Sequence, residues 1–184
     1  GNFGDLFFSG GYLTSYNLNC VPNTPVVANV NVVFFEDLKG KFVPSTIESK
    51  VRDVLNFSNI SIHELTGYNK EVITNINSLN YSYTSEIIPN YVISTGTGIL
   101  DLQPSKITFG EKKIVTDMVI DSMSGELPMQ GKRVGIKLFL NHPSLPNLDE
   151  NFTCTGFLIQ RNITSNVNEI VKNSISVTQH ILEQ

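Results

Sequence analysis

Few residues in this chain could do acid–base, nucleophilic or metal chemistry, and those few are widely separated. The three histidines, His63, His142 and His180, stand in the strings IHE, NHP and QHI. None shows the HxxxH or HExxH spacing that lets two imidazoles reach one zinc ion, and no cysteine pair lies beside them. We therefore predict no metal site, and we expect each histidine to lie in a loop or on a strand face.

Three short strings contain residues that also occur in phosphate-binding or nucleophile loops. Gly96 and Gly98 follow an apolar run in STGTGILD, but Pro104 would interrupt the helix that a phosphate-binding turn needs, so a strand-to-strand turn is the better interpretation. Ser124, in SMSGE, lacks the leading glycine of a GxSxG motif and also indicates a turn. The string FGEKK has no Gly-Lys-Ser/Thr, and it indicates the tip of a hairpin.

Asp117 and Asp121 are the most suggestive carboxylate pair. They lie four residues apart in one expected strand and therefore on one face. Strand geometry separates them by roughly 13 Å, whereas a retaining glycosidase holds its two carboxyls about 5 Å apart. We interpret the pair as solvent-facing polarity or a subunit contact. The sequence thus predicts no catalytic, cofactor-binding or metal-binding residue, and no enzyme.

Cys20 and Cys154 are the only cysteines and have no CxxC spacing. In a reducing compartment, two such cysteines are more often small core or surface residues than a disulfide. We expect the first, although the sequence alone does not decide whether the two are bonded.

Composition limits the kinds of partner. Charged residues make up 16% of the chain, against about 25% in an average soluble domain. A surface this poor in charge is often one that other subunits cover.

The net charge is -4 and no run of lysine and arginine exceeds two residues, so tight binding of nucleic acid is not expected. No apolar run approaches the roughly 18 residues that cross a bilayer, and the first residues lack the basic region of a signal peptide. We expect a soluble, unexported protein.

Hydrophobic periodicity predicts a mainly β protein. The string VVANVNVVF alternates strictly and predicts a strand with one buried face, formed by Val26, Ala28, Val30, Val32 and Phe34. Other short apolar runs, separated by turn residues, predict further strands in DLFFSG, YLTSYNLN, EVITNINSLNYSYTSE, NYVIST, KITF, KIVTDMVIDSM, RVGIKLFLN, FTCTGFLIQ and NSISVTQHIL. SIHELTGYNK and NHPSLPNLDEN are expected to be loops. The fold class is therefore a β-sandwich or a partial barrel of antiparallel strands, in a single domain over residues 1–184.

One segment shows helical rather than strand periodicity. Ser45 and Glu48 form a capping box behind Pro44, and apolar residues then recur at a spacing of three to four. We predict one amphipathic helix over about 45–57 that flanks the sheet.

Both ends of the chain resemble a known class of protein. GYLTSYNLN, the turn VPNTPV and the alternating strand after it are similar to structural proteins of tailed bacteriophages, in particular tail-tube-type subunits. The C-terminal string NITSNVNEIVKNSISVTQHI resembles the closing hairpin of such subunits. The resemblance implies a β-sandwich or partial barrel with a flanking helix, which associates into hexameric rings around a channel. The resemblance rests on shape rather than on an invariant motif, so it does not assign a function to any single residue of this chain.

The expected function is therefore that of a virion structural protein, a self-assembling subunit of a tail tube or tube-like ring that forms a channel for DNA. Expected partners are further copies of the chain and other virion structural proteins, with DNA only as a passing cargo and no membrane, small-molecule substrate or cofactor. Its place would be the tail of the virion, assembled in the cytoplasm of the bacterial host. The alternative is a receptor- or carbohydrate-binding β-sandwich of the fibre or adhesin type. The absence of tryptophan argues mildly against a platform that stacks sugars.

Overall fold

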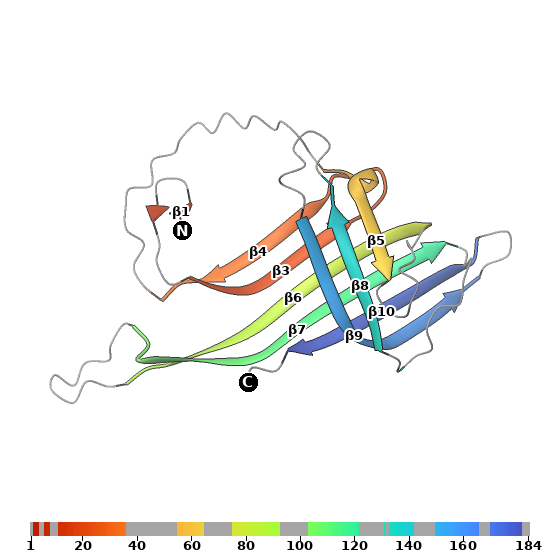
Figure 1. Ribbon diagram of the computed structural model, residues 1–184. Coiled ribbons are helices and arrows are strands. Elements are labelled where there is room, and N and C mark those ends of the chain that lie inside the picture. Colours follow the sequence, from red (N-terminus) through yellow and green to blue (C-terminus); the bar gives the residue numbers. More distant parts are fainter. Residues whose placement is uncertain are drawn as a thin grey trace.

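The structure is a computed structural model that describes residues 2–3, 6–7, 11–35, 55–64, 75–92, 103–121, 131, 133–141, 150–165 and 170–181 (Figure 1). The strands are β1 Asn2–Phe3, β2 Leu6–Phe7, β3 Tyr12–Cys20, β4 Val27–Val33, β5 Ile60–Glu64, β6 Ile76–Asn90, β7 Lys106–Asp121, β8 Arg133–Leu140, β9 Glu150–Thr164 and β10 Lys172–Ile181. One short 3-10 helix, η1, covers Phe57–Asn59. Within the described residues, no helix has the length and apolar character needed to span a membrane.

Eight of the described strands form one sheet. Their order is β4-β3-β6-β7-β10-β9-β8-β5, and all neighbours pair antiparallel. β1 and β2 pair separately with each other. The expectation of a mainly β, antiparallel fold is confirmed, and the partial barrel describes it best, because a single sheet curls over on itself.

The curl depends on a corner in β9. Residues 150–157 of this strand pair with β8, whereas residues 157–164 pair with β10. Gly156 lies at the change of partner, and an added Cβ there would collide with the backbone carbonyl of Thr178. Strands that pass from one layer to another usually do so at such a bend or bulge. Beyond the corner, β8, β5 and the first part of β9 cross over the inner face of β6 and β7 (Figure 1).

The core lies between the two crossed parts of the sheet. Phe152 of β9 shows the contact most clearly, because its ring centroid lies 5.5 Å from that of Tyr16 on β3 and 5.3 Å from that of Tyr81 on β6. The buried apolar side chains around these rings are Leu18, Cys20, Ile62, Leu79, Ile114, Met118, Ile120, Val134, Ile136, Leu138, Leu140, Cys154, Leu158, Ile175 and Val177. We call the side of the sheet that carries them the inner face and the opposite side the outer face.

The turn between β3 and β4 forms as its sequence predicts. Asn23, directly after Pro22, has a φ of 62°, and the Thr24 amide donates to the Val21 carbonyl over 3.3 Å. Proline followed by a residue of positive φ is the arrangement of a type II turn. The VPNTP string therefore joins two antiparallel strands as a tight connection.

The predicted flanking helix is not supported. Most of the range 45–57 lies outside the described residues, and the described end of it is not α-helical. Asn56 forms a β-bridge with Pro25 and then caps η1, since its side chain accepts from the Ser58 amide over 3.1 Å. A side chain that bonds to nearby backbone in this way competes with α-helix formation.

Two predictions about local structure were wrong. FGEKK is not a hairpin tip, because β7 runs through it without interruption from Lys106 to Asp121. The register with β6 shifts between Ser85 and Ile87 instead, so Gly110 and Glu111 fall at a bulge. The predicted loop SIHELTGYNK also contains a strand, since residues 61–64 belong to β5 and pair with β8.

Candidate functional site

The described histidines do not come together. His63 on β5 packs edge-on against the ring of Phe139, with centroids 5.0 Å apart. His180 on β10 pairs with Glu111, with Nδ1 and Oε1 at 2.5 Å, and His142 lies outside the described residues. No group of three potential metal-ligating side chains occurs in the part of the chain that the structure describes. The predicted turns at Gly96, Gly98 and Ser124 also lie outside that part.

Asp117 and Asp121 lie on one strand and one face, as predicted, but they have separate partners. The Ser176 hydroxyl donates to Asp117 Oδ1 over 2.6 Å. The Asn77 side-chain amide donates to both carboxylate oxygens of Asp121 over 3.2 Å. Each carboxylate is thus held by a neutral side chain from an adjacent strand, which is a structural arrangement rather than an acid–base pair.

Both cysteines are free thiols, as expected, and both are buried in the core. Burial raises the pKa of Cys20 to about 12. Burial also raises the pKa of Cys154, although the neighbouring Thr116 side chain acts in the opposite direction. The thiolate is the nucleophilic form of cysteine, so neither residue is suited to covalent catalysis.

Five polar side chains meet on the outer face, and Asp117 is the only one of them that the sequence pointed to. Cross-strand pairing places each directly beside the next, from β3 through β6, β7 and β10 to β9. At about 4.8 Å per strand, the series spans roughly 19 Å. We call it the polar row, and its members are Asn19, Asn80, Asp117, Ser176 and Gln160.

A hollow of about 210 Å³ lies over the polar row. Its described lining consists of the polar row itself together with Ser78, Leu79, Met118, Val119, Ser174 and Ile175. Serines next to the row leave space above the sheet because their side chains are short, while longer amides stand at its two ends. We call this space the polar hollow.

A second unusual surface lies at the β4 edge of the sheet. Val30 and Val32 point to the inner face, as their register with β3 shows, yet they are 53% and 37% exposed. Leu18, on the same face of the adjacent strand, is only 1% exposed. The core therefore ends between β3 and β4, and the predicted burial of one face of β4 was wrong for the single chain. We call Leu13, Ala28, Val30 and Val32 the valine face.

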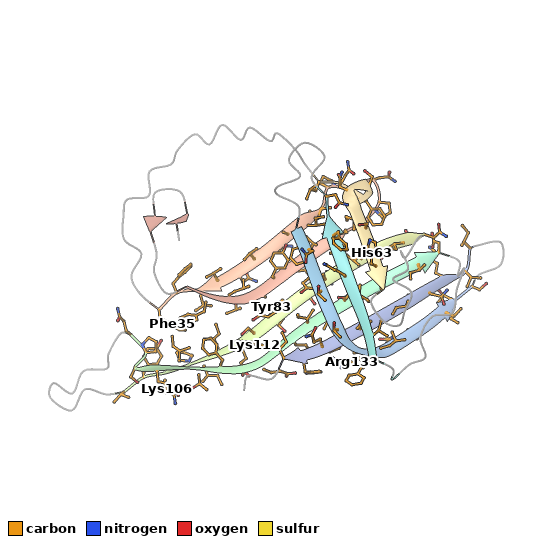
Figure 2. All side chains as sticks on the ribbon, in the orientation of Figure 1. Phe35, His63, Tyr83, Lys106, Lys112 and Arg133 are labelled. Carbon is orange, nitrogen blue, oxygen red and sulfur yellow. The ribbon has the colours of Figure 1, made fainter. Side chains whose placement is uncertain are left out.

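The third surface is a hairpin that extends beyond the rest of the sheet. β3 pairs with β6 only as far as Thr84, and β10 pairs with β7 only from Lys112 onward. Residues 87–90 and 106–109 therefore pair only with each other within the described structure. Figures 1 and 2 show this arm, with Lys106 near its described end and Lys112 at its base.

The arm also presents apolar residues. Ile87 pairs with Phe109, and Pro89 pairs with Ile107, so four apolar residues share one face. Phe109 anchors the base, where its ring centroid lies 5.8 Å from that of Tyr12 and 4.9 Å from the Lys112 ammonium. It is nevertheless 39% exposed. We call Ile87, Pro89, Ile107 and Phe109 the arm face.

No protein-family model matches this chain, and no curated protein matches its sequence. A function is therefore proposed from the residues and geometry described above. Of the three surfaces, the valine face and the arm face have the chemistry of protein contacts, and the polar hollow has that of a small-ligand site.

Proposed function

We propose that this chain is a virion structural protein, a self-assembling subunit of a bacteriophage tail that forms the tail tube or a tube-like ring. Copies of the chain would bind one another around a channel through which DNA passes without specific binding. Other virion structural proteins would bind the ring. We propose six subunits per ring because the tail-tube-type proteins that both ends of the chain resemble form hexameric rings. The proposed location of the protein is the tail of the virion, and the subunits would assemble in the cytoplasm of the host.

The observation that carries this proposal is the uncovered valine face. β4 has the strict alternation of a half-buried strand, and Val30 lies beside Tyr16 of β3, which packs on the core. A soluble protein rarely leaves contiguous apolar side chains of this kind in water unless another surface covers them. The hydrophobic pattern is thus that of a core strand whose cover comes from outside the single chain.

A second copy of the chain is the partner that fits best. β4 and β5 are the two edges of the eight-stranded sheet, and within the described residues each pairs on one side only. Unpaired strand edges bind other strands readily. A contact between two different edges is head-to-tail, and head-to-tail contacts generate rings when the rotation closes.

The arm face would supply a further contact. A two-stranded hairpin on its own is marginally stable in water, and this one presents Ile107 and Phe109 on a single face. Packing against a neighbouring subunit would bury these residues and stabilise the arm. A subunit with an edge contact and a projecting arm can bind neighbours in two directions, as a stacked tube requires.

The test is to place charge on the valine face. The double variant Val30→Lys/Val32→Lys should remain folded, because both side chains are already exposed in the single chain. It should lose assembly, because two buried ammonium groups without partners would each cost several kcal/mol at the contact. Sedimentation velocity of the variant and the wild type at matched concentrations measures the loss.

The control is Asn29→Lys, which adds one positive charge on the same strand but on the opposite face. It should assemble like the wild type. If the double variant assembles as well as this control, the valine face is not the contact. A wild-type chain that stays a monomer or forms a slender trimer would instead favour a receptor- or carbohydrate-binding module.

A further inference from the structure

We propose that the polar hollow on the outer face is a binding site for a neutral sugar of one ring or the end of a neutral oligosaccharide. The site is separate from the assembly surfaces, since its members lie on β3, β6, β7, β10 and β9 rather than on β4 or the arm. The proposal therefore does not depend on the proposed tail function.

The polar row offers hydrogen-bonding groups that its internal bonds do not use up. The Asn17 side-chain amide donates to Asn80 Oδ1 over 2.8 Å, and this bond orients the Asn80 side chain. The Asn80 NH2 group itself has no partner among the described residues. Ser176 occupies one oxygen of Asp117, and the other oxygen has no partner among the described residues. An oriented donor and an ionised acceptor thus stand side by side, because Asn80 pairs directly with Asp117.

This pairing matches the hydrogen-bonding chemistry of adjacent hydroxyl groups. Each sugar hydroxyl both donates and accepts, so one can donate to the Asp117 carboxylate while its neighbour accepts from the Asn80 amide. Asn19 and Gln160 stand at the ends of the hollow, and their exposed side-chain amides can both donate and accept hydrogen bonds. Hydrogen bonds to a charged acceptor are about twice as strong as neutral ones.

Charge and polarity exclude other classes of ligand. Asp117 is the only charged side chain in the described lining, so phosphate and carboxylate groups would be repelled. An apolar ligand would remove water from amides and hydroxyls without replacing their hydrogen bonds, which costs free energy for each group. A single carboxylate among neutral groups also falls short of the ligand set that a divalent cation prefers.

The size of the hollow favours a small ligand. A volume of about 210 Å³ lies below the roughly 300–1,000 Å³ that is usual for pockets that take drug-sized ligands. Val119 contributes an apolar wall that the C–H edge of a sugar ring could contact. No aromatic ring lines the described hollow, so binding rests on hydrogen bonds and should be weak for one copy. An assembly of several copies would raise the apparent affinity through multivalency.

The experiment measures binding of the full-length chain to an array of neutral and acidic glycans, with inhibition by free neutral sugars. We expect binding to a subset of the neutral glycans and none to their sulfated or phosphorylated forms. Asp117→Ala and Gln160→Ala should each weaken binding, the first by at least about tenfold because it removes the charged acceptor. Asn29→Ala is the matched control, since it removes an exposed outer-face amide away from the hollow, and it should bind like the wild type.

Sedimentation of the same variants separates this proposal from the tail function. Asp117→Ala should assemble like the wild type while it loses glycan binding. Failure of the wild type to bind any neutral glycan would overturn the proposal, as would equal binding by Asp117→Ala and Asn29→Ala. Loss of assembly by Asp117→Ala without glycan binding in the wild type would show that the hollow is a protein contact instead.

Discussion

At the scale of single residues, Gly156 allows the sheet to turn its corner. It stands where β9 changes its partner from β8 to β10, and the Thr178 carbonyl occupies the space that a side chain would need. Any side chain there would push the two parts of the sheet apart. The crossed arrangement that buries Phe152 against Tyr81 depends on this close approach.

Gly156→Val should therefore destabilise the fold. Overpacking of a tight site typically costs about 1–3 kcal/mol, and a collision with backbone cannot be relieved by a rotamer change. Chemical denaturation of this variant, beside Thr153→Val in the exposed part of the same strand, measures the difference. An unchanged free energy of unfolding for Gly156→Val would show that the corner is formed in another way.

The buried thiols give a second test at this scale. Burial raises the pKa of Cys20 from 9.0 to about 12, which lowers its thiolate fraction at pH 8 roughly a thousandfold. We expect Cys20 in the folded chain to react with a thiol reagent at least that much more slowly than in denaturant. Rapid reaction under native conditions would place Cys20 outside the core.

The same difference in pKa has a consequence for stability. The unfolded chain releases the Cys20 proton at a pH near 9, whereas the folded chain keeps it until about 12. The contribution of Cys20 to stability is therefore fully present below pH 9 and is lost as the pH rises from about 9 to about 12. The free energy of unfolding of Cys20→Ala should decline less over that range than that of the wild type.

Residue chemistry could be predicted from the sequence only where it is local. The shared face of Asp117 and Asp121 and the unbonded state of the two cysteines both follow from spacing and composition. The polar row could not be predicted, because its five members come from five strands. Only the pairing register places Asn80 beside Asp117, and no short stretch of sequence specifies that register.

At the scale of elements, alternation was a good guide to strands and a poor guide to what covers them. The pattern of VVANVNVVF located β4 correctly, but the single chain does not bury its apolar face. β7 was predicted as two strands with a tip between them, because a glycine within a polar string reads as a turn. A bulge accommodates Gly110 instead, and β6 keeps the two parts in one strand.

The helix prediction rested on a local capping signal. The described end of that range carries its own strong local signal, in which Asn56 and Asn59 bond to each other's backbone and cap η1. A side chain that bonds to nearby backbone in this way favours a turn over an α-helix at these residues.

The arm makes a prediction at the element scale. Ile107→Ser/Phe109→Ser removes the apolar part of the arm face on β7 and should weaken assembly, because little contact area would then be buried there. Ile88→Ser is the control, since Ile88 is also exposed, at 44%, but lies on the opposite face of the arm. Light scattering across a concentration series compares the two.

Circular dichroism should show the same β content for both arm variants, because the arm lies beyond the pairing with β3 and β10. Equal assembly by the double variant and the control would exclude the arm face as a contact.

At the scale of the whole molecule, the main feature is a sheet that curls without closing. A closed barrel has no edges, whereas this sheet has one edge at β4 and another at β5. In sheet order, the inner face is covered from β3 through to β5 but not at β4, and the arm carries further exposed apolar residues. Low charge over the surface removes much of the repulsion that would keep copies apart. These features together are what an assembling subunit needs.

Imaging the purified chain by negative-stain electron microscopy over a range of concentrations tests the central claim most directly. Rings with a central channel, or tubes made of such rings, are the expected result, and they should disappear in Val30→Lys/Val32→Lys but not in Asn29→Lys. The account would be contradicted if every concentration showed only separate particles of the size expected for one chain of 20.4 kDa.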